Sequence, residues 1–314
     1  MPPSGREAGV LLLAHGGPAT PAEVPTFIRE MLGHDVSDRR MAMLAERYRA
    51  IGGASPMPAI VRGLGEALTR AMGLPVFVGM RYGRPSIEEA VDHAHADGIR
   101  LLASVYLSPH LPELTAERCR ESVERRTRSL DAALEVRYAG AWHRQPAYLR
   151  AEAEAAQAAL LRLPDGRRDR AHVIFSAHSL PMQAAHGPNG YDERVRESAE
   201  LVAALAGLSA ADWSVAYQSA PASGVAWLGP PIRDTIAMLA AAGVKDVVVV
   251  PLGFVVDSLE VLYDIDVELR DLAHRYGMGL ERAPLPNLSP VLVDALKGAV
   301  QNVLSRTDAQ KEPV

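Results

Sequence analysis

The stretch Val247-Val248-Val249-Val250-Pro251-Leu252 is a continuous apolar run, without alternation between apolar and polar positions. Such a run is typical of a parallel strand that helices cover on both faces. Further short apolar runs recur along the chain and are each followed by a helical pattern: Val10–Ala14, Val76–Met80, Leu101–Leu107, Leu134–Tyr138, His172–Ser176 and Trp213–Tyr217. Strands that alternate with helices predict an α/β fold with parallel sheets.

The length of 314 residues exceeds the usual single domain of about 100 to 200 residues, so two domains are expected. A long Ala-rich amphipathic helix and the polar segment 164–169 separate the first set of strands from the second. We therefore predict an N-terminal α/β domain over residues 1–148 and a C-terminal α/β domain over residues 149–289. A last helix, at about residues 290–305, follows a proline-rich connection, and the sequence leaves open on which domain it packs.

Composition and charge argue against several classes of protein. The net charge is -5, and no run of basic residues lacks interleaved acids, so nucleic acid is a poor partner. The single cysteine, Cys119, can build neither an intramolecular disulfide nor a complete Cys-ligated cluster. No apolar run reaches the ~20 residues of a membrane span, and none suits a signal peptide. We expect a cytoplasmic protein without an integral membrane segment.

Polar sequence follows three of the predicted strands at their carboxyl ends: Ala14-His15-Gly16-Gly17-Pro18, Ser176-Ala177-His178-Ser179-Leu180-Pro181, and Gly253-Phe254 leading to Asp257. In open α/β sheets, ligands bind beyond the carboxyl ends of the strands. His178 can be a hydrogen-bonded structural residue at a strand end or part of a site. The serines and the proline around it favour a site.

Acidic residues recur in steps of three and four after the last of these strands, a spacing that predicts one helix face: Asp257, Glu260, Asp264, Glu268 and Asp271. Such a stripe can simply be hydrated, and acids in a first turn also favour the helix dipole. It can equally form a path for a cation, because carboxylate and imidazole ligands suit divalent first-row metals. The residues alone leave both interpretations open.

The segment 176–181 resembles the signature of the ferrochelatase family, and further motifs follow in that family's order. In the second half they are Tyr217-Gln218-Ser219, Trp227-Leu228-Gly229-Pro230 and the acidic segment 254–268. In the first half they are His15-Gly16-Gly17-Pro18, the segment 48–56 and Met80-Arg81-Tyr82. The resemblance covers about residues 10 to 300, and on these motifs the chain is identified as a member of the family.

The resemblance implies two similar flavodoxin-like or Rossmann-like domains with parallel sheets and a porphyrin in the cleft between them. It also implies that His178 and Glu260 are the catalytic pair that handles pyrrole protons and metal. An imidazole suits both tasks, because it titrates near neutral pH and ligates ferrous iron. Asp264 and Glu268 would be further metal-handling residues that guide iron inward or protons outward.

Porphyrin contacts are implied for residues of the first half. Arg47, Tyr48 and Ser55 match family positions that touch the macrocycle or its propionates, and an arginine can bind a carboxylate through paired hydrogen bonds. His15 departs from the family pattern, because members often carry Met or Tyr there, on the macrocycle face opposite His178. Our hypothesis is that His15 binds the porphyrin product as an axial ligand. Ser258 also departs, since many members have His at this position, and a step performed by that His cannot be carried over.

The implied activity is that of a ferrochelatase in haem biosynthesis, with Fe²⁺ as a substrate. The segments 254–264 and Leu107-Ser108-Pro109-His110 look closer to Gram-positive members, which typically use coproporphyrin III rather than protoporphyrin IX. We expect no organic cofactor. We also expect no iron–sulfur cluster, because the cysteine-bearing extension of animal members is not found here. The haem acceptor cannot be predicted.

Three alternatives accompany this prediction. The first is a ferrochelatase that prefers protoporphyrin IX. The second, of another class, is a porphyrin or haem carrier without chelatase activity, which His15 and Ser258 motivate. The third is a related chelatase that loads cobalt into sirohydrochlorin, and the segments 52–56 and 227–230 argue against it.

Overall fold

The computed structural model describes residues 7–33, 35–130, 134–185, 189–220 and 224–305. The first half contains β1 (Ala8–Gly16), α1 (Val24–Leu32), α2 (Asp38–Ala50), α3 (Met57–Met72), β2 (Val76–Tyr82), α4 (Ile87–Ala96), β3 (Leu101–Tyr106), α5 (Glu113–Arg128) and β4 (Glu135–Tyr138). The second half contains α6 (Pro146–Leu161), β5 (His172–His178), α7 (Met182–Ala185), α8 (Tyr191–Ala206), β6 (Trp213–Gln218), α9 (Ile232–Ala241), β7 (Asp246–Val250), α10 (Leu259–Leu262), α11 (Arg270–Arg275), β8 (Gly279–Arg282) and α12 (Pro290–Leu304). Short 3₁₀ helices occupy Pro21–Glu23 and Arg168–Arg170, and a π-helix, Asp264–Leu269, connects α10 to α11.

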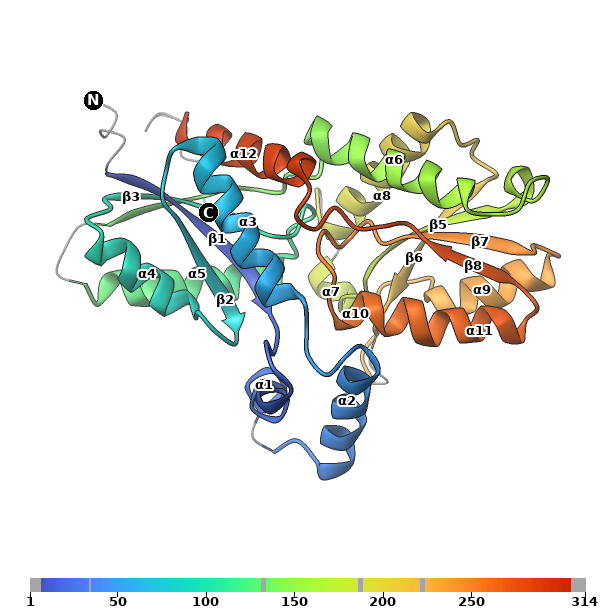
Figure 1. Ribbon diagram of the computed structural model, residues 1–314, viewed down its shortest axis with the longest axis horizontal. Coiled ribbons are helices and arrows are strands. Elements are labelled where there is room, and N and C mark those ends of the chain that lie inside the picture. Colours follow the sequence, from blue (N-terminus) through green and yellow to red (C-terminus); the bar gives the residue numbers. More distant parts are fainter. Residues whose placement is uncertain (1–6, 34, 131–133, 186–188, 221–223, 306–314) are drawn as a thin grey trace.

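Each half contains one four-stranded parallel sheet, and the two sheets share one strand order. The first runs β2-β1-β3-β4 and the second β6-β5-β7-β8. In register, Val10 of β1 lies opposite Val76 and Ala103, while Phe175 of β5 lies opposite Val215 and Val250. Figure 1 shows the two sheets at opposite ends of an elongated molecule. The predicted α/β class with parallel sheets is confirmed.

The seven predicted strands are all present, and an eighth, β8, was not foreseen. This edge strand pairs with β7 alone. Two of its side chains form ion pairs instead of entering the core: Glu281 with Arg162 and Arg282 with Asp266. A strand without a continuous apolar run gives little signal in the sequence.

Local sequence accounts for several helix ends. Ser86 and Glu89 form a reciprocal capping box at the start of α4. Ser289 caps α12 by accepting a hydrogen bond from the Leu292 N–H, and Pro290 fills the first helical position. Gly73 ends α3 in a left-handed conformation, with φ of 67°. These signals fix the boundaries of helices that cover the sheets.

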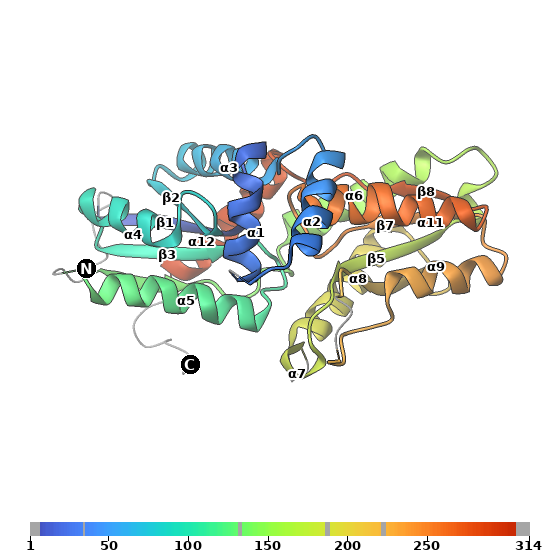
Figure 2. The same ribbon diagram turned by 90° about the horizontal axis from the view of Figure 1, so that it is seen from below.

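The last helix, α12, returns to the first half of the molecule. It packs against α3 and β3 as well as α6 (Figures 1 and 2). Its Leu296 belongs to the same buried cluster as Leu12 of β1 and Phe175 of β5, so one hydrophobic core extends through both halves. The proposed domain boundary at residue 148 falls in the first turn of α6 and stays a prediction. Within the described ranges, no helix is long and apolar enough to cross a membrane.

Candidate active site

His15 and His178 occupy equivalent positions in the two halves. His15 lies at the carboxyl end of β1, and His178 is the last residue of β5. Each of these strands is the place where the strand order of its sheet reverses, which is where open α/β sheets bind ligands. Both imidazoles line one cavity of about 200 Å³, together with Glu260 at the start of α10.

A second cavity of about 890 Å³ contains His178 and Glu260 in its wall as well. The smaller cavity is otherwise lined mainly by apolar side chains, among them Leu107, Leu180 and Phe254. The larger one also has a mostly apolar lining, including Met43 and Trp227, and in addition contains acids and arginines: Asp264, Glu268, Arg40, Arg47 and Arg233. His178 and Glu260 therefore line two largely apolar cavities, the larger of which also has charged walls, an arrangement that suits a flat apolar ring with charged substituents.

The ring of His178 is held in one orientation. Its Nδ1 lies 2.6 Å from the carbonyl oxygen of Ser179, and because a carbonyl only accepts, Nδ1 carries the hydrogen. In the neutral ring, Nε2 then has its lone pair available to take a proton or to ligate a metal. Tyr191, in the wall of the smaller cavity, donates to the His178 carbonyl oxygen at 3.1 Å.

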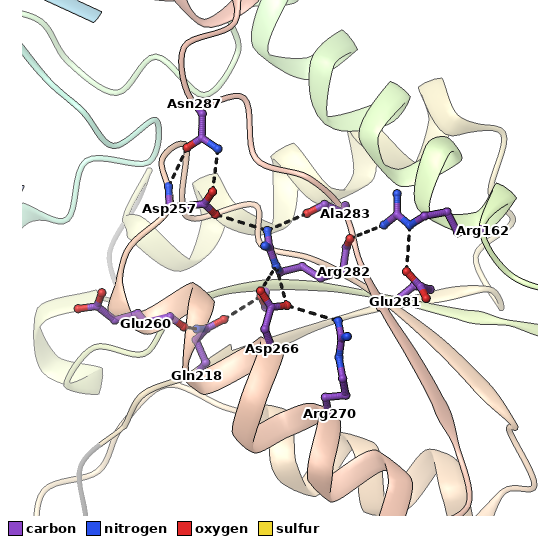
Figure 3. Close-up of polar contacts among 11 residues, drawn as sticks. Arg162, Gln218, Asp257, Glu260, Asp266, Arg270, Glu281, Arg282, Ala283 and Asn287 are labelled. Atoms are coloured by element: carbon purple, nitrogen blue, oxygen red, sulfur yellow. Dashed lines mark hydrogen bonds and ion pairs between the residues drawn. The ribbon is translucent and has the colours of Figure 1, made fainter. Parts of the chain in front are cut away.

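Three motifs that lie far apart in the sequence meet around Gln218. Ser176 donates to Gln218 Oε1 at 2.9 Å, and Gln218 Nε2 donates to the carbonyl oxygen of Glu260 at 2.7 Å (Figure 3). Ser179 donates through Oγ to the carbonyl oxygen of Leu228 at 2.8 Å. The strand end that carries His178 and the helix that carries Glu260 are thus fixed to one another by side chains of the same sheet.

Glu260 accepts a hydrogen bond from Ser258, with Oγ and Oε2 2.7 Å apart, and Ser258 itself is buried. Burial alone would raise the pKa of Glu260. The electrostatic effects of His15 and His178, together with the hydrogen bond from Ser258, lower this pKa by more. The pKa of Glu260 therefore lies below its ordinary value. Burial lowers the pKa of His15, although the carboxylate of Glu260 opposes the change. Ser258 thus supports an ionised Glu260, a task that needs no imidazole.

The predicted acidic stripe is present only in its middle. Glu260, Asp264 and Glu268 line the larger cavity. Asp257 precedes α10 and accepts from Asn287, while Asp271 pairs with Arg275 at the exposed surface. The expectation of a five-residue stripe is wrong at both ends. The segment starts before the helix begins, and it then continues as a π-helix, in which the Glu268 N–H donates to the Tyr263 carbonyl oxygen. π-Turns occur frequently at functional sites.

Arg47 of α2 reaches across the cavity to this acidic segment. Its guanidinium lies 3.3 Å from Asp264 Oδ1 and 3.1 Å from Glu268 Oε1, and 4.9 Å from the ring centre of Tyr263. Burial raises the pKa of Asp264 to about 6, against the opposing effects of a hydrogen bond from Ser219 and the charge of Arg47. A carboxyl with this pKa exchanges protons close to neutral pH.

Tyr48 and Ser55, two of the proposed porphyrin contacts, lie beside the cavities. Tyr48 is 4% exposed and packs edge-on against Phe27, with ring centres 6.2 Å apart. Ser55 is buried, and its Oγ accepts from the Met57 N–H. Neither residue lines the two cavities, whereas His15 and Arg47 do. Porphyrin contact by Tyr48 and Ser55 stays a prediction.

Several site residues were not singled out from the sequence. Tyr191 and Arg233 touch or line the site and lie outside the motifs quoted above, whereas Ser219 lies within one of them. Within the described residues, no group of three or more His, Cys, Asp or Glu side chains is close enough to hold a metal ion. The proposed metal-handling residues are instead spread along the cavity wall, as a path for a substrate ion requires.

The two parallel sheets, which share one strand order and each have a histidine at the switch point, form a chelatase-like fold of two similar α/β units. SirB from Bacillus subtilis, solved with Fe³⁺, superposes with a TM-score of 0.63 over 97% of this chain and 98% of that chain, at 12% identity. CbiX, the terminal enzyme of sirohaem biosynthesis in denitrifying bacteria, superposes with a TM-score of 0.51 at 15% identity, over 95% of this chain and 100% of that one. At these identities the likeness concerns the fold.

The sequence comparisons are more specific. The Ferrochelatase family model matches residues 7–304. A ferrochelatase of Deinococcus radiodurans is 33% identical, over 93% of this chain and 95% of that protein. A coproporphyrin III ferrochelatase of a Mycobacterium species is 35% identical, over 92% of this chain and 88% of that protein. The chain therefore belongs to the ferrochelatase family and is a porphyrin metal chelatase.

Proposed function

We propose that this chain inserts ferrous iron into coproporphyrin III, as a step of haem biosynthesis, with His178 and Glu260 as the catalytic pair. The observation that carries the proposal is that both side chains line both cavities, with His178 Nε2 unprotonated in the neutral ring. A porphyrin ring bound beside these two side chains would then present its nitrogens to both groups.

Insertion requires that both pyrrole N–H protons leave and that iron loses its water. His178 Nε2 can accept a proton or meet the incoming ion, and an ionised Glu260 can do the same from the neighbouring helix. Asp264 and Glu268 continue from Glu260 along the wall of the larger cavity. With a pKa of about 6, Asp264 can pass protons outward at neutral pH, and its carboxylate form can pass iron inward.

The preference for coproporphyrin III rests on charge. Arg40, Arg47 and Arg233 come from both halves of the chain and line the larger cavity. Coproporphyrin III has a propionate on every pyrrole ring, whereas protoporphyrin IX has them on only half of its rings, so the former can use more of these guanidinium groups, of which Arg47 and Arg233 would exchange their present pairs with Asp264 and Glu268 for propionates. Relatives in Mycobacterium and Anoxybacillus flavithermus that are 35% and 30% identical are named coproporphyrin III ferrochelatases. Protoporphyrin IX is the alternative substrate.

The test is anaerobic insertion of Fe²⁺ into each porphyrin, followed by loss of porphyrin fluorescence at equal enzyme concentration. Faster turnover of coproporphyrin III supports the proposal, and faster turnover of protoporphyrin IX would overturn the preference. Binding of either porphyrin without turnover at substoichiometric enzyme would instead favour a carrier. We expect the same rate after dialysis against a chelator, because we propose neither an organic cofactor nor an iron–sulfur cluster.

A further inference from the structure

Arg282, the last residue of β8, lies behind the acidic segment rather than in the cavity (Figure 3). Its Nε donates to both carboxylate oxygens of Asp266, at 2.8 and 3.0 Å. Its Nη1 lies 3.6 Å from Asp257 Oδ1. The side chains of Arg282, Asp257 and Asp266 are only 15%, 22% and 24% exposed. One largely buried guanidinium therefore joins two acids that flank Glu260 in the sequence.

Asp257 is fixed from a second side by Asn287. The Asp257 N–H donates to Asn287 Oδ1 at 2.9 Å, and Asn287 Nδ2 donates to Asp257 Oδ2 at 2.8 Å. The Asn287 N–H also donates to the carbonyl oxygen of Val255, and its φ of 48° is one that Asn tolerates better than most residues. The turn before Ser258 is thus tied to the segment that follows β8.

Asp266 fixes the other end of the segment. Asp264 and Glu268, two residues away on either side, line the larger cavity, whereas Asp266 does not line it and points toward Arg282 (Figure 3). It meets Arg282 and also Arg270, whose Nη2 lies 3.6 Å away. Because Arg282 and Arg270 pair with the Asp266 carboxylate, they fix the rotation of the π-helix about its axis. This rotation decides whether Asp264 and Glu268 face the cavity.

We propose that Arg282 is a positioning residue for iron entry. By pairing with Asp257 and Asp266 it turns Glu260, Asp264 and Glu268 toward the cavity, and it neutralises two acids that would otherwise add to the repulsion within the segment. The inference rests on the proposed chelatase function and assigns a role to a residue that contacts neither cavity. Metal sites commonly depend on such outer partners, which orient the groups that meet the ion.

The test compares wild type, Arg282→Met and Arg282→Lys in the iron-insertion assay, with the concentrations of Fe²⁺ and porphyrin varied separately. For Arg282→Met we expect KM for Fe²⁺ to rise about tenfold or more, the range seen when outer partners of metal sites are removed. KM for porphyrin and porphyrin binding, measured by fluorescence quenching, should stay near the wild-type values. Arg282→Lys should recover part of the loss, because it keeps the charge but not the two-oxygen contact. Arg275→Met, which removes an exposed pair on α11, is the matched control.

The outcomes separate the inference from the proposed function. Wild-type protein that inserts iron into neither porphyrin would refute the function, and the inference with it. Wild-type turnover combined with an unchanged iron KM in Arg282→Met, or with equal losses for iron and porphyrin, would refute the inference alone. If Arg282→Met does not fold, Asp266→Asn replaces it, since it keeps the side-chain shape but removes the charge. The same selective rise in iron KM is expected.

Discussion

Replacing Ser258 by Ala should shift the acidic limb of the activity profile. The Ser258 hydroxyl is buried and lies 2.7 Å from Glu260 Oε2, so it stabilises the ionised carboxylate. A hydrogen bond to a charged group contributes about 1.5 kcal/mol at the low end of the measured range. One pH unit corresponds to about 1.4 kcal/mol, so the pKa of Glu260 should rise by about one unit. In the variant, Glu260 is therefore protonated, and inactive as a base, at a pH at which the wild-type carboxylate is still ionised. As the pH is lowered, the variant loses activity at a higher pH than wild type.

The assay is kcat/KM for ferrous iron, measured anaerobically from about pH 3.5, which lies below the ordinary Glu pKa of about 4.3, up to about pH 8, because this ratio reports the ionisation of the free enzyme. The acidic limb of Ser258→Ala should lie about one pH unit above that of wild type. Ser209→Ala, which removes a hydroxyl from the exposed turn before the start of β6, at the opposite edge of the sheet from His178, should leave the limb in place. An unmoved limb in a folded Ser258→Ala protein would show that Glu260 does not control this ionisation.

Three further predictions concern the proposed catalytic pair, His15 and the buried Glu152. His178→Ala and Glu260→Ala should each abolish most turnover while porphyrin binding stays measurable, and a near-normal rate in either would refute the assigned roles. His15→Ala should change the visible spectrum of the haem product complex, and an identical spectrum would exclude axial ligation by His15. Glu152 is 1% exposed and, among the described residues, neither carboxylate oxygen has a hydrogen-bond partner. Burial raises its pKa, so the folded protein holds a proton that the unfolded chain releases, and stability is lost as the pH rises above the ordinary Glu value. Glu152→Gln should therefore resist urea better than wild type at pH 8, with a smaller difference near pH 5; an equal midpoint at pH 8 would contradict this.

The fold could be predicted largely because most of its strands are short apolar runs, although β4 alternates with Glu135 and Arg137. β8 escaped this signal because Glu281 and Arg282 use their side chains for ion pairs. The positions of His15 and His178 followed from the rule that ligands bind at strand ends, which needs only the order of strands and helices. The orientation of the His178 ring could not follow from sequence, because it depends on a contact with the carbonyl oxygen of Ser179.

The acidic segment shows a different limit. A spacing of three and four residues assumes one regular helix, yet Asp257 lies before the helix and Asp264–Leu269 is a π-helix. The wider turn is stabilised by partners that lie elsewhere in the sequence, above all Arg282. The family motifs include residues that line the cavities. Arg282, which contacts Asp257 and Asp266 but lines neither cavity, lies in none of these motifs.

The distribution of arginines around this segment indicates which acid is available for chemistry. Five acids lie between residues 257 and 268. Arg47 pairs with Asp264 and Glu268 from the cavity side, and Arg282 pairs with Asp257 and Asp266 from behind. Within the described residues, Glu260 has no arginine partner, and its carboxylate is held by the Ser258 hydroxyl beside two imidazoles. Since no arginine balances its charge, we expect Glu260 to be the acid that gains most from an arriving ferrous ion, whereas Asp264, with a pKa raised to about 6, binds a proton more readily.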